Sequence, residues 1–302
     1  MKLRCYPTLM TVLVLSLTTV SARAAVFTLG SAASYAALGQ AGVTNTGPSI
    51  ILGNVGGSIG TPAVTGFPPG VVVPPSSILS GSSTVFTDAT AAYMTAQGMA
   101  GAIDLTGTTL GTGIATNLAA GVYGFNSSAS LTGALVLDAG GLNTATWIFQ
   151  IGSSLTTASA SSVLIINGGS TGPFTGSITW AVGSAATLGT TTAFQGTIIS
   201  QAGSVLNTGA TIACGRVISL NAAVTLDSNN ISMGNCTAAA GTGGPGGTGG
   251  PGGPGGTGGT GDPGGGGVVG AVVPEPGTVA LLASGLLAMF MRRRTKSAKR
   301  QP

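Results

Sequence analysis

The side chains that could perform acid–base or metal chemistry are few in this 302-residue sequence, and they lie far apart. The chain contains no histidine, which is the most common general base and a frequent metal ligand. Enzymes that cleave polysaccharides need clustered carboxylates or basic groups. We therefore expect no catalytic residue, no metal site and no cofactor. The charged residues between positions 25 and 236 are Arg216, Asp88, Asp104, Asp138 and Asp227, of which the last two are typical of turns.

The positive net charge of the chain belongs to its two ends. The formal charge is +4, but nine of the ten Lys and Arg residues lie in residues 1–24 or from Arg292 onward. The segment between them is nearly neutral, whereas nucleic-acid binding depends on many cationic contacts with phosphates. The sequence therefore predicts no nucleic-acid partner.

The N-terminal end has the composition of an export signal. Lys2 and Arg4 precede an apolar run from Leu9 to Val20 and the small-x-small triplet Ala22-Arg23-Ala24. We predict a signal peptide over residues 1–24. The alternative is an N-terminal membrane anchor, but a spanning helix needs roughly 20 apolar residues and this run has about 12.

A glycine-rich segment over residues 241–267 repeats Gly-Gly-Pro and Gly-Gly-Thr and offers almost no side chains to pack. We interpret it as a linker. Glycine at every third position also suggests a collagen triple helix. The second glycine of each triplet, however, removes the imino acids that stiffen such chains.

The last segment, residues 268–302, has three parts in a fixed order. Pro274-Glu275-Pro276 is followed by an apolar stretch over residues 278–291 and by Arg292-Arg293-Arg294. This order resembles the PEP-CTERM sorting signal of Gram-negative bacteria, which implies cleavage near the motif and export to the surface. The alternative is an ordinary membrane anchor whose basic end stays cytoplasmic. Both interpretations place the body of the protein outside the cytoplasm.

Two cysteines remain in the body once Cys5 leaves with the signal peptide. In an oxidising compartment, Cys214 and Cys236 either form a disulfide that staples the last turn of the body or remain two buried thiols.

The elements that must position the body's side chains are one helix and many short strands, in a single domain over residues 25–240. Apolar residues recur at spacings of three and four from Val85 to Ile103, which predicts a helix from about Thr84 to Gly101. The remaining sequence consists of short runs rich in Val, Ile, Leu and Thr that Gly, Ser and Asn interrupt. Such runs are typical of strands.

Five of these runs can be aligned without gaps, and a similar run begins at Gly42-Val43-Thr44. The fourth positions are 24, 31, 20 and 18 residues apart, which is compatible with the coils of a solenoid. Because strand side chains alternate, the apolar third column points inward and the second and fourth columns point outward. The third column is Leu131, Leu155, Ala186, Leu206 and Val224. The predicted outward residues are Ser130, Ser154, Ala185, Val205 and Ala223 in the second column and Thr132, Thr156, Thr187, Asn207 and Thr225 in the fourth.

Stacked coils would turn these columns into rows on a flat, uncharged face. Threonine is stiff at χ1, so such rows lose little entropy on meeting a rigid partner. The alternative is an ordinary solvent face on which threonine ladders stabilise neighbouring strands. Residues 25–236 contain no Lys or Glu, which usually keep surfaces soluble and sheet edges protected. Their absence favours a binding face.

At the level of motifs, the body resembles the bacterial and fungal ice-binding proteins. The similar stretches run from Val26 to Ile231 and are Phe27-Thr28-Leu29-Gly30-Ser31 with Tyr35, Thr44-Asn45-Thr46-Gly47-Pro48, Val64-Thr65-Gly66-Phe67-Pro68-Pro69-Gly70, Leu131-Thr132-Gly133, Trp147-Ile148-Phe149-Gln150-Ile151-Gly152-Ser153, Leu155-Thr156-Thr157-Ala158-Ser159, Ala186-Thr187-Leu188-Gly189 and Ala223-Val224-Thr225-Leu226-Asp227-Ser228.

The resemblance implies a mainly β fold: a discontinuous, right-handed parallel β-solenoid of triangular section, with one α-helix parallel to its axis and one flat face that adsorbs to ice. Some members of the family carry a Thr-Ala/Gly-x-Thr/Asn motif. Thr208-Gly209-Ala210-Thr211 and Thr106-Gly107-Thr108-Thr109 fit it, which adds Thr208 and Thr211 to the candidate site. Thr157-Ala158-Ser159-Ala160 departs from it in the last place.

The expected function is therefore that of a secreted or surface-anchored, monomeric antifreeze protein whose partner is the ice surface. The competing hypothesis is a structural or adhesive protein of the cell surface or of its exopolysaccharide matrix, since a sorting signal and a long linker suit that role equally well. An anchored ice-binding domain would combine the two by attaching a cell to ice.

Overall fold

The computed structural model describes residues 28–58, 64–170, 173–234 and 236. The predicted signal peptide (1–24), linker (241–267) and sorting segment (268–302) lie outside the described residues. The domain boundaries at residues 25 and 240 therefore remain predictions.

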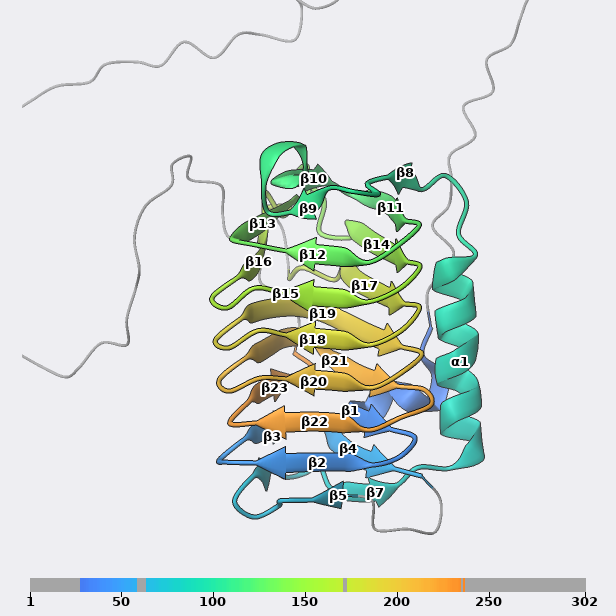
Figure 1. The fold of residues 1–302 in the computed structure, drawn as a ribbon, viewed down its shortest axis with the longest axis vertical. Coiled ribbons are helices and arrows are strands. Elements are labelled where there is room, and N and C mark those ends of the chain that lie inside the picture. Colours follow the sequence, from blue (N-terminus) through green and yellow to red (C-terminus); the bar gives the residue numbers. More distant parts are fainter. Residues whose placement is uncertain (1–27, 59–63, 171–172, 235, 237–302) are drawn as a thin grey trace, which may run out of the picture. The chain divides into compact units, whose positions relative to one another are not determined.

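The described chain winds into stacked coils whose strands pair only in parallel, as Figure 1 shows. Each coil is a triangle with three sides, and we call the three resulting surfaces face 1, face 2 and face 3. Face 1 is an eight-stranded sheet that consists, from one end to the other, of β5 (Val64–Thr65), β2 (Val43–Thr46), β22 (Val224–Asp227), β20 (Ser204–Leu206), β18 (Ala186–Leu188), β15 (Leu155–Thr157), β12 (Ala129–Leu131) and β9 (Thr109–Leu110).

Faces 2 and 3 belong to one 15-stranded sheet. Face 2 contains β6 (Val71–Val72), β3 (Ile50–Leu52), β23 (Asn230–Ser232), the first halves of β21 (Thr211–Ser219) and β19 (Ala193–Ser200), β16 (Ser162–Ile166), β13 (Ala134–Asp138) and β10 (Asn117–Ala119). Face 3 contains β7 (Ile78–Ser80), β4 (Asn54–Gly57), β1 (Tyr35–Gly39), the second halves of β21 and β19, β17 (Ser177–Val182), β14 (Thr146–Ile151), β11 (Gly121–Phe125) and β8 (Ile103–Asp104).

The two long strands β19 and β21 join face 2 to face 3 because they bend across the shared corner. Their register shifts between Gln195 and Thr197, where β21 has one residue more than β19. Gly196 has a φ of +101° at this point, and Cys214 has a φ of +50°. This is a β-bulge, which turns a strand and redirects its side chains.

The order of the coils does not follow the order of the chain. Strands β1 to β7 form the coils at one end; the chain then runs along the solenoid in the single helix, α1 (Ser83–Gln97), and coils back from β9 until β22 pairs with β2 (Figure 1). Thr225 thus lies beside Thr44, and Ile231 beside Ile51. Two short 3-10 helices, η1 (Gly30–Ser34) and η2 (Gly113–Ala115), complete the fold. The discontinuous solenoid that the resemblance implied is confirmed.

The helix is shorter than the predicted 84–101. Ser82 caps its N-terminus by accepting a hydrogen bond from Val85 N, and the helix ends at Gly98. Gly101 then adopts a φ of +82°, so Ile103 belongs to β8 and is exposed. The apolar spacing continued past the helix, but two glycines ended it because they lack the side chain that would favour helical backbone.

Helix α1 covers face 3 with small residues. Ala89, Ala92 and Ala96 are buried against aliphatic side chains of the strands beneath, including Ile148 and Ile218. Two glutamines join the layers: Gln97 Nε2 donates to the carbonyl of Ala181 (2.9 Å), and Gln150 Nε2 donates to those of Ala96 (2.9 Å) and Met99 (2.7 Å).

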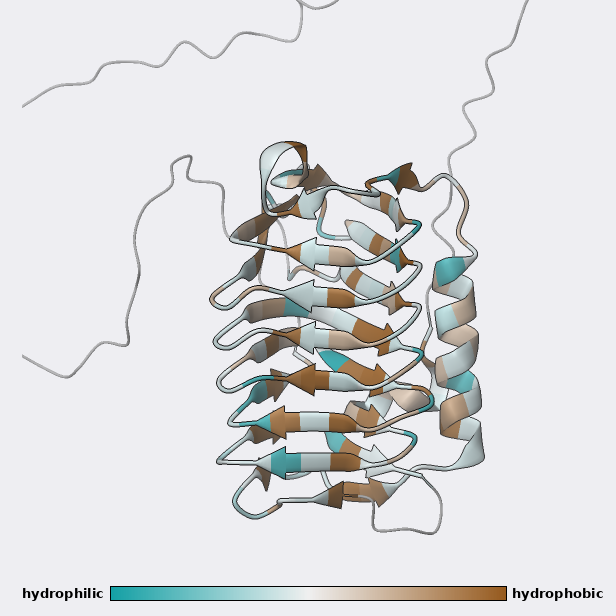
Figure 2. Cartoon of the chain, viewed as in Figure 1, coloured by the Kyte–Doolittle hydropathy of each residue, from teal (hydrophilic) through white to brown (hydrophobic). Residues whose placement is uncertain are grey.

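The interior of the solenoid is filled by the inward side chains of all three faces. Tyr123, Phe149, Trp180 and Phe194 come from successive coils and pack in a line with ring centroids 5.6, 3.9 and 4.9 Å apart. The first two pairs are stacked and the third is tilted. Figure 2 shows the underlying alternation as brown and pale bands along β18 and β22. The predicted core column is confirmed, because Leu131, Leu155, Ala186, Leu206 and Val224 are all buried.

Cys214 and Cys236 form a disulfide, with the two sulfur atoms 2.00 Å apart. Of the two possibilities that the sequence left open, the structure therefore contains the staple. It ties the end of the described body to the β19–β21 corner.

Candidate functional site

A single outward row of small, mostly β-branched residues runs along the whole of face 1. The strand register joins its members one to the next, from one end of the sheet to the other. Parallel strands lie about 4.8 Å apart, so the row is a straight ladder with one side chain per coil. The row consists of Thr65, Thr44, Thr225, Val205, Thr187, Thr156, Ser130 and Thr109.

The register corrects the alignment made from sequence. That alignment placed Thr132 and Asn207 in one column with Thr156, Thr187 and Thr225. In the structure, Ser130 lies beside Thr156, and Val205 lies between Thr187 and Thr225. The two segments were displaced by two residues. Such an error leaves the inward and outward alternation intact because the side-chain period of a strand is also two.

The remaining predicted residues of the two columns flank the central row on the same face. Thr132 and Asn207 follow the ends of β12 and β20, and their backbone N–H groups donate to carbonyls of the neighbouring coils. Ser154, Ala185 and Ala223 immediately precede β15, β18 and β22, respectively, and all three are half-buried. Face 1 thus carries a central row of seven β-branched residues and one serine, with small residues on one side.

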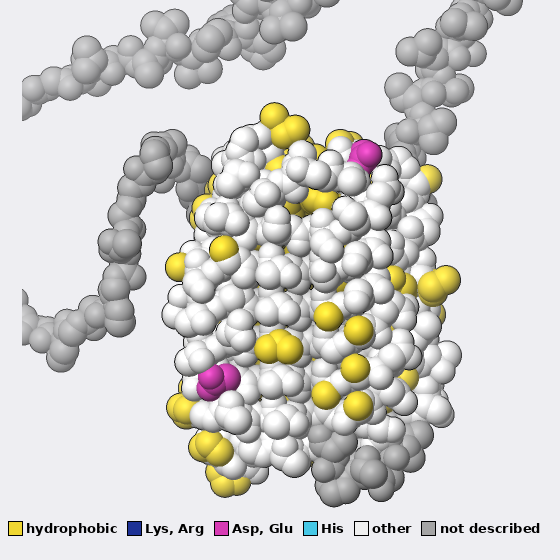
Figure 3. Space-filling view, in the orientation of Figure 1, with side chains coloured by type: hydrophobic (Ala, Val, Ile, Leu, Met, Phe, Trp, Pro, Cys, Tyr) yellow, Lys and Arg dark blue, Asp and Glu magenta, His cyan; other side chains and the backbone are white. Residues whose placement is uncertain are grey.

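The hydroxyl groups of the central row are available to an outside partner. Ser130 Oγ donates to Thr109 Oγ1 (3.3 Å), but Thr44, Thr65, Thr156, Thr187 and Thr225 make no side-chain hydrogen bond with any described residue. In Figure 3, which looks onto this face, the centre shows neither basic nor acidic side chains, and acidic groups appear only toward its margins. The central row therefore presents methyl and hydroxyl groups without charge, and Asp227, at the end of β22, lies at the margin of the face.

The Thr-x-x-Thr motif residues are placed differently. Thr208 lies in the turn after β20, where its Oγ1 donates to Asp227 Oδ2. Thr211 begins β21 on face 2, in register with Ala193 and Asn230. Neither belongs to the central row. Of the second motif, Thr109 is in the row, whereas Thr106 Oγ1 accepts a hydrogen bond from Asn126 N (2.8 Å).

Three members of the row were absent from the site predicted by sequence: Thr44, Thr65 and Thr109. Each lies next to an inward aliphatic residue. Thr44 follows Val43 and Thr65 follows Val64. Thr109 precedes Leu110. For Thr44 and Thr65, the Val-Thr pair after a small residue was the available signal. These three threonines were left out of the predicted site because only five segments could be aligned without gaps.

The aspartates outside face 1 serve local structure. Asp88 on α1 accepts hydrogen bonds from Ser31 Oγ (2.6 Å) and Ser31 N (2.8 Å), which lower the pKa of its carboxyl group. Asp104 accepts one from Thr106 N (2.8 Å), and its pKa is also lowered by contact with Thr106. Asp138 accepts from Gly140 N (2.9 Å), as expected of a turn residue.

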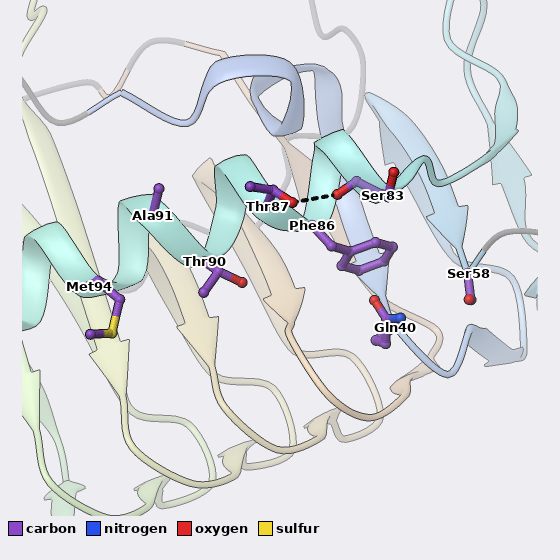
Figure 4. Close-up of a pocket in the computed structure, with 8 residues that line it drawn as sticks. All are labelled: Gln40, Ser58, Ser83, Phe86, Thr87, Thr90, Ala91 and Met94. Atoms are coloured by element: carbon purple, nitrogen blue, oxygen red, sulfur yellow. Dashed lines mark hydrogen bonds between the residues drawn. The ribbon is translucent and has the colours of Figure 1, made fainter.

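The described residues do not assemble an acid–base or metal centre. They contain no group of three or more His, Cys, Asp or Glu residues that could hold a metal ion. A cavity of about 550 Å³ lies between α1 and the first coils, and Figure 4 shows its lining of Gln40, Ser58, Ser83, Phe86, Thr87, Thr90, Ala91 and Met94, none of which is charged. Among the same described residues, no helix has the length and apolar character to cross a membrane.

The chain is similar to known proteins along most of its length. It is 37% identical to an ice-binding protein of Nostoc sp. (strain HG1) over 281 residues, which cover 91% of this chain and 90% of that protein. It is also 32% identical to an ice-binding protein of Flavobacterium frigoris (strain PS1), covering 68% of this chain and 75% of that one.

Solved structures share the fold of the body. One, an ice-binding protein from an Antarctic biological consortium, aligns with a TM-score of 0.60 and 33% identity, covering 68% of this chain and 90% of that chain. Another, an ice-binding protein from the Antarctic ascomycete Antarctomyces psychrotrophicus, aligns with a TM-score of 0.59 and 34% identity. The alignment covers 69% of this chain and 98% of that chain. The body of this protein thus corresponds to nearly the whole of each of these two solved chains.

Two sequence families match separate parts of the chain. Residues 272–294 match the PEP-CTERM protein-sorting motif, which confirms the resemblance of the tail and indicates sorting to the cell surface. Residues 37–232, which include every strand from β2 to β23, match the Ice-binding-like family. The chain therefore belongs to the Ice-binding-like family of proteins and carries a PEP-CTERM sorting motif.

Proposed function

We propose that this protein binds ice through face 1, and that the central row from Thr65 to Thr109 with its flanking small residues is the contact surface. The observation that carries the proposal is the unbroken ladder of eight outward residues, seven of which carry a methyl group on a branched Cβ. The relatives named above are called ice-binding proteins, and this chain is similar to them along most of their length.

The mechanism is adsorption of a whole face and not catalysis. Methyl groups in a regular ladder hold the first water layer in an ordered arrangement, and the unpaired threonine hydroxyls bond to it. Because the side chains are β-branched and fixed on a sheet, little conformational entropy is lost on binding. Once the face is attached, the crystal grows only as curved fronts between protein molecules, which lowers the freezing point and slows recrystallisation.

Site and partner follow from the same surface. The ligand is solid water, so binding needs no cofactor, and the sorting motif supports a location outside the cytoplasm. An ice-binding face also accounts for the position of the described aspartates and Arg216 away from its centre. Charged groups would order the nearby water in an arrangement different from that of ice.

A test compares two variants of one coil in the body, residues 25–240. Thr187 on β18 lies on face 1, whereas Ala193 on β19 is exposed on face 2. Thr187→Tyr should abolish most thermal hysteresis because the bulky ring holds the flat face away from the crystal. Ala193→Tyr adds the same ring to the neighbouring face and should leave hysteresis unchanged. Equal activity of both variants and the parent protein would remove face 1 from consideration.

A second role is favoured by the sorting motif at residues 272–294. A surface-anchored form would attach the cell to ice, or would act as an adhesive component of the extracellular matrix without ice binding. Slow growth of ice in a solution of the purified body distinguishes the two. Incorporation of the parent body into the solid, with exclusion of Thr187→Tyr, supports ice binding; exclusion of both supports the matrix role.

A further inference from the structure

We propose that a cavity on face 3, at the β19–β21 corner, is a binding site for a small carboxylate such as a sugar acid, with Arg216 as the cationic group. This inference is independent of ice binding, since face 3 does not include the central row.

Arg216 is the only Lys or Arg among the described residues, and it has no partner there. It is half-buried, its Nε is fully buried, and that nitrogen makes no hydrogen bond. This nitrogen is a buried donor without an acceptor, which is costly. Arg216 also lines the cavity, where an anionic group would lie beside its positive charge. Burial also lowers the pKa of Arg216, and no nearby carboxylate offsets that effect.

The cavity around Arg216 has the size and lining of a small-molecule site. Its volume is about 500 Å³, within the range of roughly 300–1,000 Å³ that is usual for such sites. Leu29, Phe174 and Ile178 supply apolar walls, and the hydroxyl residues Thr175 and Ser177 also line it. A ligand with one carboxylate and several hydroxyl groups matches this lining.

The strands align the polar groups of the cavity. Thr179 on β17, Thr197 on β19 and Arg216 on β21 are register neighbours, so a cation and two threonines form a row with steps of about 4.8 Å. The β-bulge lies directly before Arg216. Cys214, two residues before Arg216, is part of this bulge, and its disulfide with Cys236 holds the bulge in place. Bulges often redirect a side chain at functional sites.

The charge of the site selects a carboxylate over a phosphate. The guanidinium fork matches the two oxygens of a carboxylate, and one cation balances one negative charge. A phosphate monoester carries about −1.5 to −2 charges at neutral pH and would need a second cation. Among the described carboxylates, Asp88 lies near the cavity because it accepts a hydrogen bond from Ser31, next to Gly30 of the lining. It forms no ion pair with Arg216.

The test uses an advantage of the sequence: Arg216 is the only arginine in residues 25–240. The body labelled with ¹⁵N therefore gives a single Arg Nε–Hε resonance in an NMR spectrum. Titration with sodium glucuronate should shift this resonance to saturation, whereas glucose, the neutral match, and sodium chloride at equal ionic strength should not. The same titration with sodium phosphate should produce a much smaller shift.

Calorimetry with variants completes the test. Arg216→Lys keeps the charge but loses the fork, and should bind glucuronate about tenfold more weakly. Arg216→Met should show no binding while it remains folded and still enters ice. The proposal is overturned if glucuronate does not move the resonance of the parent protein, if glucose or phosphate moves it equally, or if Arg216→Met binds glucuronate as the parent does.

Discussion

At the level of single residues, Val205 shows which part of the threonine side chain matters in the central row. It lies between Thr187 and Thr225, is exposed, and has the shape of threonine with a methyl group in place of the hydroxyl. Valine keeps the branched Cβ and the restricted χ1 of threonine but has no hydroxyl group. We infer that the methyl groups carry more of the contact with ice than the hydroxyl groups do.

This inference predicts an order of activities at Thr156, which is exposed on β15. Thr156→Val keeps both branches on Cβ and should retain most thermal hysteresis. Thr156→Ser keeps the hydroxyl but loses the methyl and the χ1 restriction, so it should lose more. Hysteresis measured by microscopy on both variants gives the order, and the reverse order would show that hydroxyl groups dominate.

At the level of elements, α1 is held to the N-terminal segment by one carboxylate. Asp88 accepts two hydrogen bonds from Ser31 on η1, and these contacts lower its pKa below the usual 3.8. A carboxyl group with a lowered folded-state pKa stabilises the native state above its unfolded-state pKa. That stability is lost as the pH falls through the folded-state pKa.

We therefore predict a pH-dependent effect of Asp88→Asn. At pH 7 the variant should melt at a lower temperature than the parent body. The difference should shrink as the pH falls below about 4, where the carboxylate of the parent becomes protonated. Melting curves followed by circular dichroism from pH 7 to pH 2 measure it, and a difference that is constant over this range would contradict the assigned role of Asp88.

At the level of the whole molecule, the fold is closed by a seam between its first and last coils. β22 pairs with β2, β21 with β1 and β23 with β3, although about 180 residues separate the partners. In a continuous solenoid each coil contacts only its neighbours, so unfolding can begin at an end. Here the seam lies inside the stack, and its loss would separate the N-terminal coils from the rest.

This arrangement predicts cooperative unfolding that depends on the seam. Leu226 on β22 is fully buried and lies beside Asn45 of β2. Leu226→Ala should destabilise the body by about 2–5 kcal/mol. Fluorescence of Trp147 and Trp180, which belong to coils beyond the seam, should report the same lowered midpoint as circular dichroism. Two separate transitions would show that the coils unfold independently.

Part of the architecture could be predicted from local sequence patterns because those patterns have local causes. The alternation of apolar and small polar residues placed Leu155 inward and Thr156 outward, since a strand repeats every two residues. The start of α1 near Thr84 followed from the spacing of its apolar residues. The scarcity of charge in the body and the sorting motif could be read directly from composition and order.

The tertiary structure alone decided which residues are neighbours. A shift of two residues keeps every side chain on its face, so no local pattern could tell whether Ser130 or Thr132 lies beside Thr156; only hydrogen bonding between coils fixes that register. The pairing of Thr44 with Thr225 is likewise non-local, and so is the cavity around Arg216, whose walls come from distant segments. The sequence by itself predicted a threonine-bearing face with few charges on stacked strands. The structure decided that the face is one continuous row of eight, because the first coils pair with the last.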